Sequence, residues 1–181
     1  MSMEGIIKTY TGLFVNVTKP EKKHIRIEDI AHALSNIGRY NGHYPVFLSV
    51  GYHSLKVLEK VRKRSDFTAK MGLHALLHDA SEAYLCDLPK PIKNANRAYW
   101  GYEQEMMDVV FDKFQLNEAE YLEVIEEADK AVFEDEWHMW THFDENPIKI
   151  NKSNEQVKQA YMKAFYELVN IRNLYEREDS K

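Results

Sequence analysis

Two histidines and an aspartate are the residues whose types and spacing could do chemistry. His78 and Asp79 stand side by side in Leu73-His-Ala-Leu-Leu-His-Asp-Ala-Ser-Glu-Ala-Tyr84, a stretch that is otherwise largely apolar. Polar groups in such a setting need partners. His53, on the preceding predicted helix, is the natural third member. Imidazole nitrogen and carboxylate oxygen together make a mixed donor set for one divalent ion, which could be Mn, Co, Fe, Ni, Zn or Mg.

A divalent ion at this place would act through the water that it binds. It lowers the pKa of that water toward neutrality and polarises a phosphoryl oxygen, so that nucleophile and electrophile arise at one point. Attack of metal-bound water on a phosphate ester is therefore the chemistry that these residues indicate. For any one of them alone, a buried histidine bonded to a neighbouring acid is the commoner explanation.

Helices must position these side chains, because apolar residues recur at three- and four-residue spacing along most of the chain. The predicted helices span about 27–37, 46–64, 68–84, 98–114, 118–137 and 154–175. The prolines of 88–91 predict a loop. Residues 9–18 partly alternate polar with apolar, which predicts a short hairpin or an extended arm. The expected fold is all-α: a compact single-domain bundle of about six helices, with its metal-binding core at about 27–137.

Composition narrows the classes of partner and compartment. The chain has 181 residues, of which 44% are hydrophobic, and 29 acidic residues against 24 basic ones give a net charge of -5. This balance disfavours binding of a long nucleic acid. Cys86 is the only cysteine, which excludes an intramolecular disulfide and fits a reducing compartment. No apolar run suggests a signal peptide or a membrane span, so we expect a cytoplasmic protein with no membrane contact.

Four segments resemble the superfamily of HD-domain metal-dependent phosphohydrolases. They are Ile27-Glu-Asp-Ile-Ala-His-Ala-Leu-Ser35, Arg39-Tyr-Asn-Gly-His43, Ser49-Val-Gly-Tyr-His-Ser54 and Leu76-Leu-His-Asp-Ala-Ser-Glu-Ala-Tyr-Leu-Cys-Asp-Leu-Pro89. The resemblance covers roughly residues 27–133 and is closest to the bacterial 5'-deoxyribonucleotidase branch. It implies the HD-domain fold, His53, His78 and Asp79 as metal ligands, and an aspartate of a later helix as the fourth ligand.

Asp129 is the residue that best matches this fourth ligand. Its apolar neighbours Ala128 and Val132 turn it toward the interior of the predicted helix packing. Distance along the chain is no objection, because a helix that returns antiparallel can bring it beside His78. Three nearby acids remain alternatives: Glu126, Glu127 and Asp135.

Two further carboxylates are candidates for proton transfer. Glu82 follows His78 by four residues and Asp79 by three, which places it one turn away on the same predicted helical face. There it could act as general acid or base on the bound water. Asp87, in the following loop, is the rival for protonating the leaving oxygen. The plainer alternative is that Glu82 forms a salt bridge with a lysine.

Arg39 is the first candidate for binding the substrate. A planar guanidinium grips phosphate oxygens in a bidentate way, and the resemblance implies an arginine at this place for phosphate. His43 follows it closely and could face the substrate. Lys90 and Lys93 flank a proline after Asp87 and could add positive charge near the pocket.

Two other patterns have plainer explanations. His74 precedes His78 by four residues, a spacing that two zinc ligands can have, but Ala75 stands where a zinc protease motif carries glutamate. We therefore expect His74 to be a packed histidine. Trp137 and Trp140, three residues apart, favour a core or dimer contact over stacking on a nucleobase.

The expected function is hydrolysis of a nucleotide phosphate ester, above all a deoxyribonucleoside 5'-monophosphate. A deoxynucleoside triphosphate triphosphohydrolase or pyrophosphohydrolase is the close alternative. Hydrolases of the guanosine alarmone resemble this motif but carry His-Asp-x-x-Glu-Asp, whereas Ala83 follows Glu82 here. A non-catalytic nucleotide-sensing helical module is the alternative of another class. The resemblance further implies a homodimer or a larger homo-oligomer.

Overall fold

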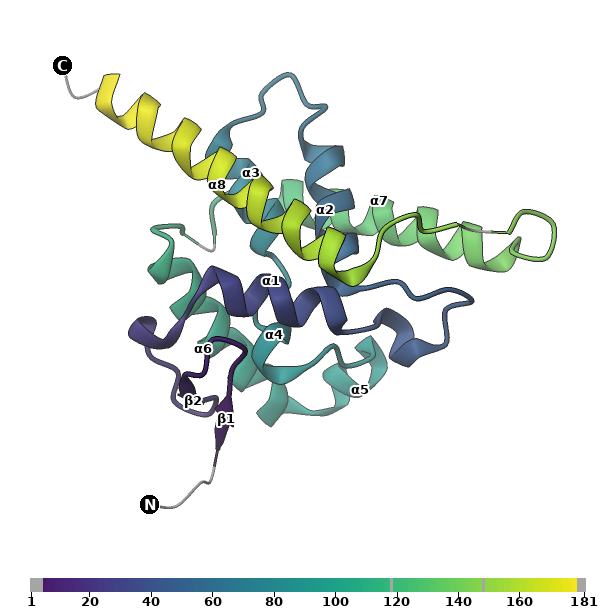
Figure 1. The fold of residues 1–181 in the computed structure, drawn as a ribbon, viewed down its shortest axis with the longest axis horizontal. Coiled ribbons are helices and arrows are strands. Elements are labelled where there is room, and N and C mark those ends of the chain that lie inside the picture. The colour runs from purple at the N-terminus through teal and green to yellow at the C-terminus, as the bar shows by residue number, and fades with distance from the viewer. Residues whose placement is uncertain (1–4, 118, 148, 179–181) are drawn as a thin grey trace.

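A small hairpin and a set of helices make up the structure, a computed structural model that describes residues 5–117, 119–147 and 149–178 (Figure 1). The hairpin strands are β1 (Ile6–Lys8) and β2 (Phe14–Asn16). The helices are α1 (Ile27–Asn36), α2 (Val50–Val61), α3 (Ala69–Leu77), α4 (Glu82–Leu85), α5 (Lys90–Ala95), α6 (Arg97–Lys113), α7 (Leu122–Thr141) and α8 (Asn154–Glu178), with short 3₁₀ turns at Lys22–His24 and Arg39–Gly42. The predicted all-α, compact, single-domain fold is confirmed.

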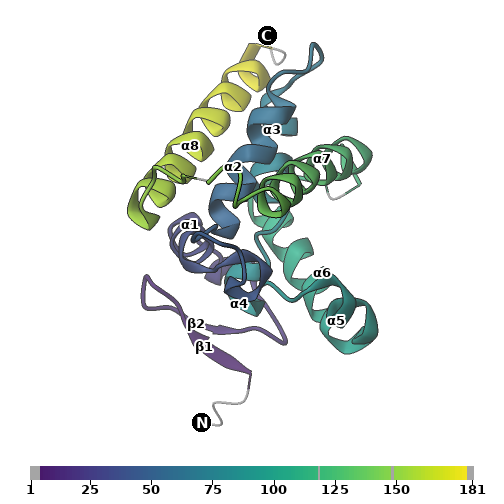
Figure 2. The same cartoon turned by 90° about the vertical axis from the view of Figure 1, so that its right-hand side faces the viewer.

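Helix α2 is the central element, because it packs against α1, α3, α7 and α8. Figure 2 shows α8 on one side of it and α7 on the other. The buried apolar residues of α2 are Val50, Val57, Leu58 and Val61. His53 lies among them on the same helix and is fully buried. The chain therefore carries one imidazole into the middle of the bundle.

Helices α1 and α2 approach each other closely at Gly51, two residues before His53. A Cβ atom at Gly51 would lie 3.2 Å from the carbonyl carbon and oxygen of Leu34 and from the amide nitrogen of Ser35. These are backbone atoms of a packed helix, which do not yield easily. Gly51 thus sets the separation of α1 and α2, and with it the depth at which His53 is held.

Alanine should have opposite effects at two helical glycines. Gly51→Ala should lower the free energy of unfolding by about 1–3 kcal/mol, because overpacking outweighs the better helix propensity. Gly101→Ala in α6, where a Cβ would meet nothing within 4 Å, should raise it by about 0.5–1 kcal/mol. Chemical denaturation of both variants measures the difference. A Gly51→Ala variant as stable as Gly101→Ala would contradict the close approach.

The amino-terminal segment forms a hairpin, one of the two predicted alternatives, but its first strand, Ile6–Lys8, lies before the predicted range of 9–18. Ile7 pairs with Val15 in an antiparallel register, and Val15 is fully buried. The turn between the strands is tied to α1, because the amide and the hydroxyl of Thr11 donate to the carboxylate of Asp29 at 2.7 and 2.9 Å. The hairpin therefore covers α1 without contributing to the site.

The single helix predicted over 68–84 is wrong, since α3 ends at Leu77 and α4 starts only at Glu82. Between them the chain makes a tighter turn, in which the amide of Ala80 donates to the carbonyl of Leu77, three residues earlier, at 2.9 Å. Tyr161 of α8 donates its hydroxyl to the carbonyl of Leu76 at 2.6 Å. This tertiary bond satisfies a carbonyl near the helix end, which local periodicity does not reveal. His78 and Asp79 consequently sit in a turn.

Other boundaries also differ from the predictions. The predicted loop at 88–91 is partly wrong, because α5 begins at Lys90 and proline is tolerated in the first turn of a helix. Helix α2 begins at Val50 because Ser49 caps it, accepting the Tyr52 amide at 3.1 Å. Helix α7 follows Tyr121, whose φ of 66° is left-handed. Glu118, the predicted first residue of that helix, lies outside the described residues.

Candidate metal centre

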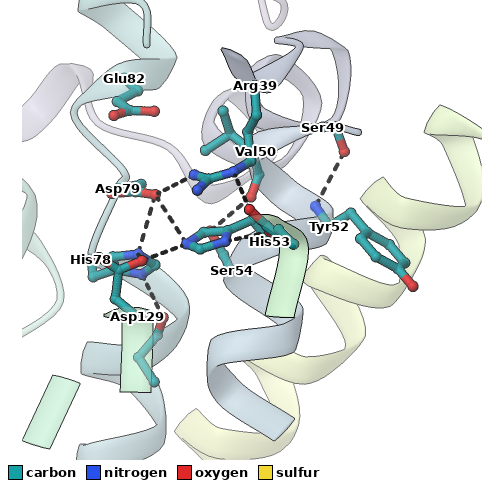
Figure 3. A network of polar contacts seen from close by, with 12 residues as sticks. Arg39, Ser49, Val50, Tyr52, His53, Ser54, His78, Asp79, Glu82 and Asp129 are labelled. Atoms are coloured by element: carbon teal, nitrogen blue, oxygen red, sulfur yellow. Dashed lines mark hydrogen bonds and ion pairs between the residues drawn. The ribbon is translucent and has the colours of Figure 1, made fainter. Parts of the chain in front are cut away.

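Side chains from three parts of the fold converge on one point (Figure 3). His53 comes from α2, His78 and Asp79 from the turn after α3, and Asp129 from α7. One ligand atom each of His53, His78 and Asp129 lie within 4.8 Å of one another, a group that could hold a metal ion. Asp129 thus lies beside both histidines, and its role as a ligand stays a prediction. The three alternative acids are exposed: Glu126, Glu127 and Asp135.

The donor atoms have separations that suit a common ion. An ion with bonds of about 2.1 Å separates adjacent octahedral ligands by about 3.0 Å and opposite ones by about 4.2 Å. His53 Nε2 lies 2.8 Å from Asp129 Oδ1 and 3.9 Å from Asp79 Oδ2. His78 Nε2 lies 3.1 Å from Asp79 Oδ2 and 3.8 Å from Asp129 Oδ1. His53, His78 and Asp129 are thus spaced so that they could share a divalent ion, and Asp79 lies beside this group of three.

The ring of His78 is oriented toward this point. Its Nδ1 lies 2.9 Å from the Ala75 carbonyl, to which it donates, so Nε2 is directed at the acids. Nε2 is shielded from solvent and makes no hydrogen bond of good geometry. Burial opposes the charged form, but Asp79 and Asp129 outweigh it and raise the pKa of His78 to about 9. A metal taking this nitrogen would replace that proton.

Glu136 holds the other histidine and was missed by the sequence predictions. Its Oε1 lies 2.8 Å from Nδ1 of His53. Glu136 is 3% exposed and lies on α7 seven residues after Asp129, two turns along the same face. That spacing, together with the apolar Val132 between them, is the signal that could have found it.

Arg39 reaches the centre through a short backbone pairing with the start of α2. Its amide donates to the Leu48 carbonyl at 2.8 Å, and its Nε donates to Glu136 Oε2 at 3.1 Å. Nη1 lies 3.9 Å from Asp79 Oδ2. Burial would lower the pKa of Arg39, but the charges of Glu136 and Asp79 outweigh it and raise the pKa. Arg39, which was predicted to bind phosphate, therefore lies beside the candidate metal ligands and carries a permanent positive charge.

The charge of Asp79 is strongly stabilised. Burial alone would raise the pKa of this carboxyl, but His78, His53 and Arg39 outweigh it and hold the pKa well below its usual range. Burial also acts to raise the pKa of Asp129, but its hydrogen bond with His53 and the charges of His78 and His53 together outweigh burial and lower this pKa. Both side chains are thus anionic at neutral pH, as candidate metal ligands should be.

Glu82 and Asp87, the two predicted proton donors, show the opposite behaviour. Glu82 is buried, and burial together with Asp79 and Asp87 raises its pKa well above the usual range. Burial also raises the pKa of Asp87, with a further contribution from Asp79. Both pKa values are thus shifted in the direction that a general acid needs. The salt-bridge alternative has a basis too, since Lys93 Nζ lies 3.5 Å from Glu82 Oε1.

The remaining substrate-binding candidates divide into one inside the site and two outside it. Lys93 Nζ is 2.6 Å from Glu103 Oε1, so its charge is already engaged. Burial would lower the pKa of Lys93, but Glu103 and Glu82 outweigh this effect and raise the pKa. His43 and Lys90 are exposed, and the described contacts do not join them to the metal ligands. The structure therefore supports Arg39 more than the other three.

A cavity of about 230 Å³ opens beside the metal ligands, between α3, α6 and the start of α7. His78, Asp79, Lys93 and Glu103 line its polar part. The apolar part is formed by Met107, Phe111, Leu122 and Ile125. Glu103, which the sequence predictions did not include, is buried. A small molecule could therefore lie here with a charged group near His78 and Asp79.

His74 is a packed histidine, as predicted. Its ring is 2% exposed and lies between the rings of Phe111 and Tyr121, with centroids 5.1 and 5.5 Å away. Burial lowers the pKa of His74 to about 4. The charge of Glu120 opposes this shift, and the smaller effect of Lys70 adds to it. The imidazole is therefore neutral in the folded protein.

His74 should make the protein sensitive to acid. The unfolded chain binds a proton near the ordinary histidine pKa of about 6.5, but the folded protein does so only near a pH of about 4. The unfolded state thus binds more protons between these values, and stability falls as the pH drops through this window. Between about pH 7 and about pH 5, the melting temperature of His74→Leu should fall less than that of the parent protein. Exposed His142→Gln is the control, and equal losses in all three proteins would contradict the assignment.

The predicted core position of Trp137 is wrong, because this side chain is 51% exposed. Trp140 is partly buried and contacts two tyrosine rings, with centroids 5.2 Å from Tyr40 and 5.5 Å from Tyr44. Trp140 thus supports the segment that carries Arg39. Dimer contact through Trp137 stays a prediction.

The chain is similar to two bacterial proteins. It is 37% identical over 112 residues to the uncharacterized protein YfdR of Escherichia coli, which covers 62% of this chain and 60% of that protein. It is 34% identical over 110 residues to an uncharacterized protein of Rhodobacter capsulatus, covering 59% and 56%. The chain thus matches less than two thirds of the length of these curated relatives. No protein family model matches the chain.

Membrane insertion has no support in the described helices. Within residues 5–117, 119–147 and 149–178, none of them combines the length and the apolar character needed to cross a bilayer.

Proposed function

We propose that this protein is an HD-domain metal-dependent phosphohydrolase that cleaves a phosphate ester of a nucleotide, above all a deoxyribonucleoside 5'-monophosphate. One observation carries the proposal: two histidine nitrogens and two carboxylates, from His53, His78, Asp79 and Asp129, converge beside Arg39, whose side chain is 12% exposed. The resemblance of the sequence around these residues to HD-domain phosphohydrolases supports the same activity.

The residues divide the work of hydrolysis. When bound, a divalent ion supplies a water of lowered pKa and polarises a phosphoryl oxygen. Arg39 holds the phosphate, since Nε is engaged by Glu136 and the Nη groups remain for the substrate oxygens. Glu82 or Asp87 gives its proton to the leaving 5'-oxygen as the bond to phosphorus breaks. The products are a nucleoside and inorganic phosphate.

A small substrate suits the electrostatics and the space. The net charge of -5 disfavours a long polyanion, whereas Arg39 and the metal ligands form a local anion site. The cavity of about 230 Å³ next to His78 would take the organic part of the substrate. Cys86 is free and exposed, which agrees with a reducing compartment such as the cytoplasm.

Refilling the protein with metal is the direct test. Metal-depleted protein, loaded in turn with Mn²⁺, Co²⁺, Mg²⁺ or Zn²⁺, should release phosphate from deoxynucleoside 5'-monophosphates with at least one of them. A panel of ribonucleoside monophosphates and deoxynucleoside triphosphates separates the nucleotidase from the triphosphohydrolase. Release of triphosphate or pyrophosphate would select the latter. No turnover with any metal or substrate would refute the enzyme and favour a nucleotide-sensing module.

Asp79→Ala should abolish both metal binding and phosphate release. Residues that merely orient a ligand change metal affinity by about 10–100-fold, so removal of Asp79 should weaken binding by more than about 100-fold. Isothermal titration with Mn²⁺ measures the affinity, and circular dichroism should show unchanged helical content. Asp135→Asn, an exposed change on α7, is the control. Retained activity in Asp79→Ala would mean that the site lies elsewhere.

A further inference from the structure

One buried carboxylate joins the metal ligands to the phosphate-binding side. Glu136 Oε1 lies 2.8 Å from His53 Nδ1. Its other oxygen, Oε2, accepts from Arg39 Nε at 3.1 Å and from the Tyr40 hydroxyl at 2.7 Å. The backbone carbonyl of Glu136 also accepts from the Tyr44 hydroxyl at 3.0 Å. The two carboxylate oxygens therefore serve two different groups.

The first oxygen selects the tautomer of His53. An ionised carboxylate only accepts, so Nδ1 must carry the hydrogen that it shares with Oε1. Nε2, the atom directed at Asp79 and Asp129, is then the nitrogen left for a metal, which would displace the hydrogen that Nε2 shares with Asp129 Oδ1 at 2.8 Å. Glu136 thus prepares His53 to bind a metal through Nε2, in the way that carboxylate partners orient metal-binding histidines.

The second oxygen holds an unfavourable turn. Tyr40 and Asn41 have φ values of 55° and 53°, in the left-handed region that costs such residues roughly 1–2 kcal/mol each. Oε2 accepts hydrogen bonds from the side chains of both Arg39 and Tyr40, and these bonds keep the turn in place. The guanidinium is thereby fixed at its Nε while its Nη atoms stay on the side of Asp79.

We propose that Glu136 is a positioning residue that sets the metal-binding tautomer of His53 and the phosphate-binding pose of Arg39 at the same time. The proposal rests on the proposed function for the role of the anion and extends it to a linkage between the two subsites. Loss of the carboxylate weakens both metal binding and anion binding, although Glu136 touches neither ligand.

Glutamine at this position exposes the linkage, because an amide cannot serve both groups. If its oxygen faces His53, its NH₂ group meets the Nε donor of Arg39. If its oxygen faces Arg39, the NH₂ group meets Nδ1 of His53 and favours the tautomer with hydrogen on Nε2. The shape of the side chain is retained in either case, so packing of α7 against α2 changes little.

The experiment compares Glu136→Gln with Glu134→Gln, an exposed change on the same helix. Co²⁺ affinity is measured by the visible absorption of the bound ion, and inorganic phosphate affinity by calorimetry at saturating Co²⁺. We expect Glu136→Gln to weaken Co²⁺ binding by about tenfold or more and phosphate binding by a similar factor, with Glu134→Gln unchanged. If either affinity in Glu136→Gln stays within about twofold of the control, the linkage is refuted.

Nitrogen NMR of His53 in the Zn²⁺-loaded parent protein keeps the proposal testable if Glu136→Gln does not fold. The expected state has zinc on Nε2 and a hydrogen on Nδ1 protected from exchange. A Nδ1 without hydrogen overturns the assignment. All of these readouts are independent of turnover. Absence of phosphatase activity with intact linkage would count against the proposed function alone.

Discussion

A fully buried imidazole requires partners for its nitrogens, and this requirement organises the site. His53 is 0% exposed, and an unpaired polar group at such a place costs more than folding can easily offset. Both of its partners, Asp129 and Glu136, come from α7. Helix α7 must therefore pack against α2, in the register that presents both acids. The contacts that complete the site are therefore the same contacts that hold α7 against α2.

The carboxyl groups of the site fall into two electrostatic classes. Asp79, Asp129 and Glu136 have lowered pKa values because histidine or arginine cations and donors surround them. Glu82 and Asp87 have raised pKa values, because burial and the neighbouring anions dominate. The same functional group thus has opposite pKa shifts at these positions, because its environment differs. This division suits a reaction in which a leaving oxygen must be protonated beside an anionic centre.

Site residues could be predicted from the sequence where reactive side chains fall within a local helical pattern. The adjacent His78 and Asp79, the helix bearing His53, and the inward face of Asp129 are local patterns, and the structure brings all of these residues together. The hairpin and most helices were predictable for the same reason.

What was missed depends on contacts between distant segments. Glu136 looks like any acid on an amphipathic helix until Arg39 and His53 are seen against it. The end of α3 at Leu77 is supported by a tyrosine 85 residues away from Leu76. The turn at Tyr40 is left-handed although glycine follows only at position 42, because tertiary bonds hold it. Single-sequence patterns carry none of this information.

The metal-binding side chains are far apart in the chain, and this has a consequence for folding. His53 and Asp129 are 76 residues apart, so the complete set exists only after α7 has docked on α2. An ion that needs both residues binds the native protein and has no equivalent site on the unfolded chain. By mass action such an ion stabilises the docked state, by about 2.7 kcal/mol at a free concentration 100 times its dissociation constant. A metal bound here would thereby raise the equilibrium stability of the fold, whatever else it does.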